Sequence, residues 1–137
     1  MQAHVYAKAI LLGEPGQLLL LRRSQTDPKR PGEWDFAGGK VEEGEEITQG
    51  VVREIFEEAG LKLNTSAVRL VYAATVDYEE TSVTRLLFVG QAPASEIKLS
   101  YEHDKYQWVD YKKALELFPH FFYGVGLKYA LDHDLLS

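Results

Sequence analysis

A dense group of acidic residues around a single arginine is the most distinctive chemical feature of this sequence. Between residues 42 and 58, seven of the chain's 21 acidic residues accompany one basic residue, Arg53. The seven are Glu42, Glu43, Glu45, Glu46, Glu54, Glu57 and Glu58. Carboxylates that lie close together repel one another unless a positive charge sits between them. The segment therefore predicts a site at which bound positive charge compensates several carboxylates.

The second half of this segment has the pattern of a helix. Residues 48–59 carry helical periodicity, and Gly60 follows where a left-handed C-terminal cap is expected. At about 100° per residue, three carboxylates share one face and the apolar side chains share the other. The carboxylates are those of Glu54, Glu57 and Glu58, and the apolar residues are Val52, Ile55, Phe56 and Ala59. Such oxygen ligands suit a hard divalent cation, and because the chain has no cysteine we expect Mg²⁺ or Mn²⁺.

The spacing of these residues resembles the signature of a known family. Gly39, five residues, Glu45, seven residues and then residues 53–61 are similar to the Nudix box at its glycine, acidic, arginine and hydrophobic positions. The resemblance implies an α/β fold, an α/β/α sandwich with a mixed sheet between helices. It also implies divalent-metal hydrolysis of a nucleoside diphosphate linked to another group. The sequence departs from the pattern at Ala37, where many members have proline, but this change removes no ligand or proton donor.

The resemblance also implies roles for single residues. Arg53 is expected to hold a neighbouring carboxylate, Glu45 or Glu57, in a bidentate fork and so to orient the metal ligands. A glycine at position 39 permits a close backbone approach to the metal. The expected metal ligands are Glu54, Glu57, Glu58 and the carbonyl oxygen of Gly39. The expected catalytic group is Glu54, Glu57, Arg53 and Glu102.

Two residues are candidates for the general base. In the family it is either a helix glutamate, here Glu54, or an acid on a loop before a late strand, here residues 106–109. Residues 100–104 occupy that loop. Glu102 is favoured over Asp104 because a Glu-His pair recurs at this place in similar sequences.

Substrate recognition rests on fewer residues. Arg22 and Arg23 end a predicted strand, and alternation directs them to opposite faces. Arg23 is expected to bind the substrate because family members that hydrolyse nucleoside triphosphates use an arginine near this position; a surface ion pair is the alternative. Phe36 is expected to stack on the base, although aromatic residues often pack in the core instead. Residues 118–122 lack the base-reading asparagine of sanitising members, which weighs against oxidised guanine.

The remaining sequence predicts strands before and after the acidic helix. Two hairpins, one short strand and two C-terminal helices are expected, and Pro119 should separate the helices. The hairpins are residues 3–13 with 17–23 and residues 68–77 with 82–90, the short strand is 106–109, and the helices are 111–118 and 126–136. These elements predict a mixed sheet with helices on its faces.

Composition excludes several classes of protein. A chain of 137 residues with 45% hydrophobic content predicts a single domain spanning residues 1–137. The residues from Met1 to His4 lack the basic start of a secretory leader, so we expect a cytoplasmic protein. The longest apolar run, residues 18–21, is too short for a membrane span, and a net charge of −6 disfavours a nucleic-acid polymer as partner. The expected partner is a small nucleotide substrate, and the chain is expected to be a monomer or a homodimer.

Three functions are compatible with these observations. The first is hydrolysis of a (deoxy)nucleoside triphosphate to the monophosphate and pyrophosphate, favoured by the small single domain. The second is hydrolysis of another bridged substrate, a nucleotide sugar or a dinucleoside polyphosphate. The third is a non-catalytic nucleotide-binding module, since folds are reused for other functions. The intact acidic set disfavours the third.

Overall fold

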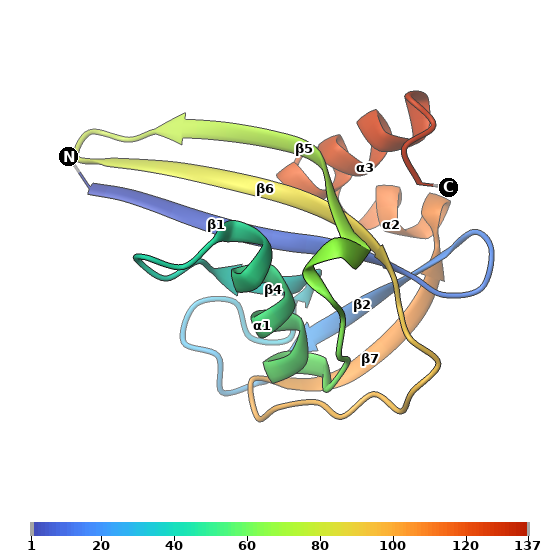
Figure 1. Ribbon diagram of the computed structural model, residues 1–137. Coiled ribbons are helices and arrows are strands. Elements are labelled where there is room, and N and C mark those ends of the chain that lie inside the picture. Colours follow the sequence, from blue (N-terminus) through green and yellow to red (C-terminus); the bar gives the residue numbers. More distant parts are fainter. Residues whose placement is uncertain (1, 137) are drawn as a thin grey trace.

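The fold is built on one long central strand. The computed structural model describes residues 2–136, and strand β1 (Gln2–Leu12) runs through its middle (Figure 1). Strand β6 (Thr81–Gln91) pairs with β1 in parallel along its whole length. On its other side β1 pairs antiparallel with β4 (Ala37–Lys40), where Lys8 lies opposite Gly38. The short strand β4, which carries the two glycines, is thus fixed to the centre of the sheet.

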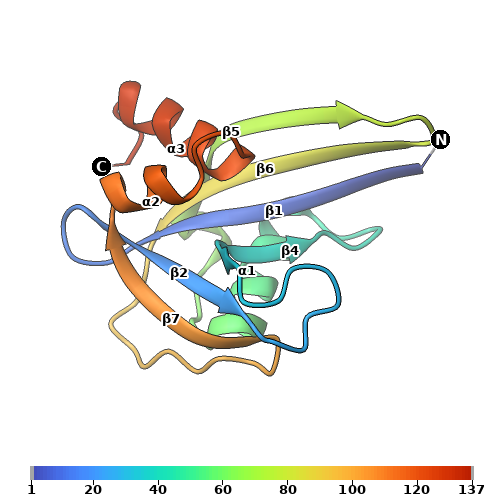
Figure 2. The same ribbon diagram turned by 180° about the vertical axis from the view of Figure 1, so that it is seen from behind.

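The remaining strands extend this sheet in two directions. Strand β5 (Val68–Asp77) pairs antiparallel with β6, and β5, β6 and β1 extend together beyond the rest of the molecule at one end (Figure 2). Strand β2 (Gln17–Arg23) touches β1 only where Leu12 faces Leu18. It pairs instead with β7 (His103–Asp110) and β3 (Trp34–Asp35). Because β2 diverges from β1, the end of β2 opens toward the loops around residues 24–33 and 100–102.

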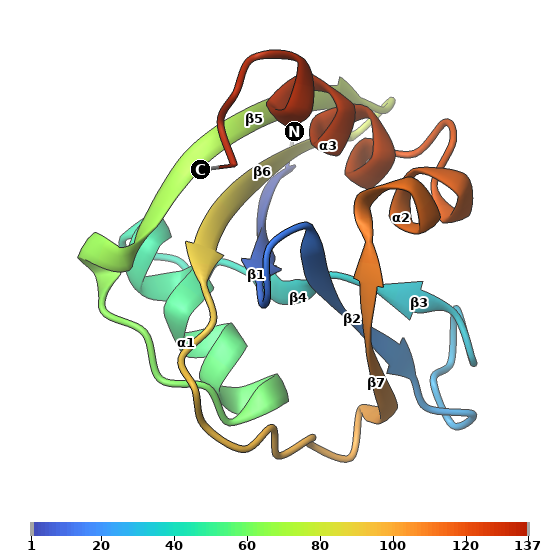
Figure 3. The same ribbon diagram turned by 90° about the vertical axis from the view of Figure 1, so that its right-hand side faces the viewer.

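Helices cover both faces of the sheet (Figure 3). Helix α1 (Ile47–Ala59) packs on one face, while α2 (Tyr111–Leu117) and α3 (Phe122–Asp132) pack on the other. A short 3-10 turn, η1 (Thr65–Ala67), precedes β5. Alternation along β2 supplies both cores, since Leu19 and Leu21 contact the α1 side and Leu18 and Leu20 the α2–α3 side. This arrangement confirms the expected mixed sheet between helices.

Most predicted elements are present, with differences that packing explains. Strand β7 begins earlier than expected and α3 runs from residue 122 instead of 126. Strands β3 and β4 were not expected, because a stretch rich in glycine has no strand propensity of its own. The first hairpin is paired only next to its turn, where Leu12 lies opposite Leu18, since most of β1 pairs with β4 and β6. Pro119 does separate α2 from α3, as predicted.

The predicted faces of α1 were only partly correct. Ile55 and Ala59 are buried as expected, and Gly60 has the left-handed φ of 70° that its capping role requires. Phe56, however, is 51% exposed, whereas Glu58 is only 6% exposed. The helix is rotated so that its buried stripe includes one carboxylate of the acidic set. No helix within residues 2–136 is long and apolar enough to cross a membrane.

Two adjacent residues of α1 provide a test of this rotation. Ile55→Ala removes a fully buried side chain and should lower the free energy of unfolding by about 2–5 kcal/mol. Phe56→Ala removes a larger but half-exposed side chain and should cost less than about 1 kcal/mol. Urea unfolding of both variants measures the difference, and a larger loss from Phe56→Ala would contradict the observed orientation of the helix.

Candidate active site

The two glycines of β4 run unusually close to their neighbours. Gly38 has a φ of 125°, and a Cβ atom there would lie 2.2 Å from the carbonyl oxygen of Ala7 on β1. A Cβ atom at Gly39 would lie 2.7 Å from the carboxyl carbon of Glu54 on α1. Position 38 therefore requires glycine, and at position 39 a side chain would have to displace the Glu54 carboxylate, so the backbone of β4 lies close to both β1 and the acidic helix.

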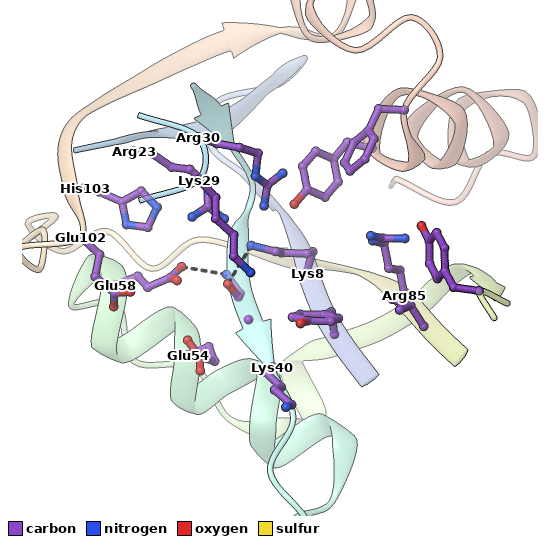
Figure 4. A pocket seen from close by; sticks show the side chains of 17 residues that line it. Lys8, Arg23, Lys29, Arg30, Lys40, Glu54, Glu58, Arg85, Glu102 and His103 are labelled. Carbon is purple, nitrogen blue, oxygen red and sulfur yellow. Dashed lines mark hydrogen bonds between the residues drawn. The ribbon is translucent and has the colours of Figure 1, made fainter. Parts of the chain in front are cut away.

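Glu54 and Glu58 face this backbone from α1 (Figure 4). Glu58 Oε1 accepts a hydrogen bond from the backbone N–H of Gly38 at 2.9 Å. Burial raises the pKa of Glu58 to about 8, although nearby Lys8 and this hydrogen bond oppose the shift. Burial also raises the pKa of Glu54, against the opposing charge of Arg53. Two carboxylates that lie four residues apart on one helix are therefore held where negative charge is unfavourable.

Arg53 donates hydrogen bonds to three carboxylates of the acidic segment. Its Nε donates to Glu45 Oε2 at 2.7 Å and its Nη2 to Glu45 Oε1 at 3.1 Å, which forms a bidentate fork. Its Nη1 lies 3.1 Å from Glu54 Oε1 and 3.2 Å from Glu57 Oε1. Nη2 also donates to the carbonyl oxygen of Lys40 at 3.2 Å. One guanidinium thus joins three carboxylates and β4, which accounts for the single arginine in the segment.

The expected metal ligands are only partly brought together. Glu54, Glu58 and Gly39 line one cleft. Glu57 does not line this cleft, because its side chain is paired with Arg53 and is 54% exposed. Within residues 2–136 no three His, Asp or Glu side chains converge closely enough to hold a metal ion. The donor set nevertheless fits a hard divalent cation, because it consists of oxygen atoms whose raised pKa values a positive charge would lower.

The cleft beside these residues has walls of opposite charge. Its volume is about 580 Å³, and Figure 4 shows acidic side chains on the α1 side facing basic side chains from the strands and the loop after β2. The acidic residues are Glu54, Glu58 and Glu102, and the basic residues are Lys8, Arg23, Lys29, Arg30, Lys40 and Arg85. Such a cleft can hold an anionic group with a cation beside it.

Arg23 lies in the cleft, but its guanidinium already has partners. Nη2 contacts Asp35 Oδ2 at 2.6 Å and Nη1 contacts Asp27 Oδ2 at 2.9 Å. Lys8 also contacts Asp35, and together with Arg23 it holds the pKa of that carboxyl below its usual range despite burial. Arg22 points the other way, toward Asp104, as strand alternation predicted. If Arg23 binds an anion in the cleft, it does so with a guanidinium that is already paired with Asp35 and Asp27.

The prediction that Phe36 stacks on the base of the substrate was wrong, because this side chain is not accessible in the cleft. Its side chain is 0% exposed. The ring stacks on Tyr123 with centroids 4.6 Å apart and meets the edge of Phe118 at 5.7 Å. Phe36 lies between β3 and β4, and its ring packs in the core between the sheet and α3. Tyr78 and Phe121, which are exposed and line the cleft, are the aromatic residues available there.

Glu102 reaches the cleft from the loop before β7. The loop is held by Ser24, whose N–H donates to Glu102 O at 2.9 Å and whose Oγ donates to Tyr101 O at 2.6 Å. Glu102 is exposed and lies on the same side of the cleft as Glu58 (Figure 4). The structure thus brings Glu102 to the same cleft as the acidic helix, as the resemblance implied.

Two residues of the site were not predicted from the sequence. His103 is buried, burial lowers its pKa to about 4, and both ring nitrogens lack a hydrogen-bond partner within residues 2–136. Lys8 is buried in the cleft wall. Its only signal was a lysine within the apolar run of β1, because a buried lysine requires several oxygen partners.

Comparison with protein families identifies this architecture. A family model described as the NUDIX domain matches residues 2–124. The nucleoside triphosphatase NudI of Escherichia coli (strain SE11) is 31% identical over 108 residues, which cover 72% of this chain and 77% of that protein. An octanoyltransferase of Myxococcus xanthus is 34% identical over 112 residues, but the match covers 78% of this chain and only 30% of that protein.

Solved structures show the same fold. The MutT protein from Methanosarcina mazei Go1 superimposes with a TM-score of 0.81 at 30% identity, covering 96% of each chain. An Ap4A hydrolase of C. elegans superimposes with a TM-score of 0.68 at 24% identity, covering 93% of this chain and 96% of the other. The second likeness is one of fold alone.

The geometry of Arg53 leads to a test of its role. Arg53→Lys keeps the positive charge but loses the fork to Glu45, so it should disturb the carboxylates rather than the binding of a substrate. We expect turnover to fall by about 10- to 100-fold with little change in KM, as is usual when a group that orients metal ligands is altered. Steady-state kinetics with Mg²⁺ measures both constants. A large rise in KM with unchanged turnover would place Arg53 on the substrate.

Proposed function

We propose that this chain, which belongs to the Nudix hydrolase family, hydrolyses (deoxy)nucleoside triphosphates to the monophosphate and pyrophosphate with the aid of Mg²⁺ or Mn²⁺. The observation that carries the proposal is the cleft with an acidic wall facing a basic wall. A triphosphate carries several negative charges along a short chain. It therefore requires both a cation held by carboxylates and basic side chains placed opposite them.

The basic wall has charge available for such a chain of phosphates. Lys8 and Arg23 are committed to Asp35. In contrast, four basic side chains of the cleft form no ion pair within residues 2–136: Lys29, Arg30, Lys40 and Arg85. In a protein with a net charge of −6 these cations attract an anion locally. Four uncompensated positive charges favour a triphosphate over a substrate with only a diphosphate.

Each residue of the acidic wall has a distinct role in this proposal. Glu54, Glu58 and the carbonyl oxygen of Gly39 hold the cation, and Glu57 completes the set of ligands. When bound, a divalent cation neutralises phosphate oxygens and makes water more acidic. Arg53 keeps Glu45, Glu54 and Glu57 in place without contacting the substrate.

Glu102 is the proposed general base. In this role its carboxylate accepts a proton from the attacking water, whose oxygen forms a bond to one of the two phosphorus atoms of the α–β bridge. The bond from that phosphorus to the bridging oxygen breaks, and the other half of the substrate leaves with the electron pair, which yields the monophosphate and pyrophosphate. Exposure of Glu102 at the mouth of the cleft then allows the proton to pass to solvent.

Other functions find weaker support. The name of the C. elegans Ap4A hydrolase makes dinucleoside polyphosphates the second candidate, and these substrates also carry several negative charges. Nucleotide sugars present fewer charges to the basic wall. A non-catalytic module is disfavoured because the carboxylates and Arg53 are all in place. The name octanoyltransferase belongs to a protein of which this chain covers less than a third, so it supports no proposal here.

A panel of substrates tests the function directly. We expect release of pyrophosphate, and not of single phosphate, from one or more nucleoside triphosphates in the presence of Mg²⁺. Chelation by EDTA should abolish turnover, and added Mg²⁺ should restore it. Ion chromatography of the products distinguishes the candidates, because faster cleavage of a dinucleoside polyphosphate or a nucleotide sugar would replace the proposed substrate. Absence of turnover with every substrate of the panel would contradict the proposal and favour a non-catalytic nucleotide-binding module.

A comparison of two glutamates tests the assignment of the base. Glu102→Gln should lower turnover by about 100-fold or more, the usual cost of losing a general base, while nucleotide binding is retained. Asp104→Asn, two residues further along at the start of β7 and paired with Arg22, is the control and should keep nearly full turnover. If Glu102→Gln kept full turnover and Glu54→Gln abolished it, the base would be Glu54.

A further inference from the structure

Lys8 is a buried lysine at the centre of the sheet, beside the two glycines. Its side chain is 8% exposed, and its ammonium nitrogen contacts three oxygen atoms. These are Asp35 Oδ2 at 3.2 Å, the carbonyl oxygen of Phe36 at 3.3 Å and the carbonyl oxygen of Gly38 at 2.9 Å. Burying an ammonium group is unfavourable unless such partners satisfy it, so these contacts hold Lys8 in one position.

The contacts of Lys8 leave it no hydrogen atom for a substrate. An ammonium group has three N–H donors, and the three oxygen acceptors use all of them. Although Lys8 lines the cleft, it can bind a phosphate only by releasing a carbonyl oxygen or Asp35. Its action must therefore pass through the backbone that it holds.

That backbone is the part of β4 which faces the acidic helix. Gly38 donates its N–H to Glu58 and accepts at its carbonyl oxygen from Lys8. The residue is thus held at both polar groups by charged side chains from two different elements. Gly39 follows directly, with Glu54 against its Cα. A shift of Gly38 would move its hydrogen bond to Glu58 and the carbonyl oxygen of Gly39 together.

We propose that Lys8 is a positioning residue, which holds the Gly38–Gly39 backbone in register with Glu58 and Glu54 and so shapes the cation site. This inference rests on the proposed function for the identity of the cation. The contacts themselves do not depend on it.

A matched variant at Lys40 distinguishes a positioning role of Lys8 from a purely electrostatic effect of its charge. It lies in the same cleft and on β4 itself, but its side chain forms no hydrogen bond or ion pair within residues 2–136. Removing a positive charge near a cation site should strengthen cation binding through Coulomb's law. If Lys8 acted only as a charge, Lys8→Met and Lys40→Met would both tighten binding of Mn²⁺. If Lys8 is a positioning residue, Lys8→Met weakens it.

The first experiment measures Mn²⁺ affinity without substrate, by electron paramagnetic resonance of free Mn²⁺. Lys8→Met should lower the affinity by about 10- to 100-fold, the range for residues that orient metal ligands. Lys40→Met should leave the affinity unchanged or raise it. An unchanged or higher affinity in Lys8→Met would overturn the proposal.

The second experiment needs no metal. Amide hydrogen exchange of the metal-free protein, followed by NMR, reports on the Gly38 N–H that is bonded to Glu58. In Lys8→Met this amide should exchange about tenfold faster or more. The Gly60 N–H, which is bonded to Phe56 O at 2.9 Å at the end of α1, is the internal control and should keep its rate. Equal acceleration of both amides would indicate general destabilisation and overturn the proposal.

A second variant covers the case in which Lys8→Met does not fold because Asp35 loses a buried partner. Lys8→Met with Asp35→Asn removes both charges while still freeing the two carbonyl oxygens, and it should show the same loss of Gly38 protection. Retained protection there would overturn the proposal. If the unaltered protein bound no Mn²⁺, the proposed function would fail, but the exchange rates would still decide the role of Lys8.

Discussion

The close passage of β4 between β1 and α1 is the constraint on which the site depends. Gly38 has no room for a Cβ atom on the side of β1, and a Cβ atom at Gly39 would displace the carboxyl group of Glu54. A side chain at Gly38 would push β4 away from β1, and one at Gly39 would move a carboxylate of the acidic helix. Contact between backbone and carboxylates lets one helix face, one strand and one loop line a single cleft.

Electrostatics in this small region is balanced locally and not by the chain as a whole. Arg53 joins Glu45, Glu54 and Glu57 on the outer side of α1. On the other side of β4, Lys8 and Arg23 share the buried Asp35, whose side chain is 1% exposed. Glu58 lies between these two groups, and among residues 2–136 its carboxylate accepts a hydrogen bond from the Gly38 N–H alone. The raised pKa of Glu58, caused by burial, marks the point where compensation is incomplete.

The stability of this arrangement comes from the two cores that flank the sheet. Ile55 and Val51 anchor α1 on one face, and Leu127 anchors α3 on the other. Because these side chains are fully buried, α1 cannot rotate to expose Glu58 without losing apolar contacts. Packing therefore decides which carboxylates enter the cleft and which remain on the surface, and the proposed division of roles among the glutamates follows from it.

The sequence by itself determined the features that depend on local spacing. The helix predicted over residues 48–59, its cap at Gly60 and the acidic set around Arg53 follow from periodicity, glycine chemistry and spacing, and the structure has this helix over residues 47–59. Tertiary structure decided the rest, because burial and pairing involve residues far apart in the chain. Phe36 turned into the core, His103 became buried, and Lys8 met Gly38 across 30 residues. No local pattern predicts these contacts, since the pairing and register of a strand depend on which of its faces is buried in the complete sheet.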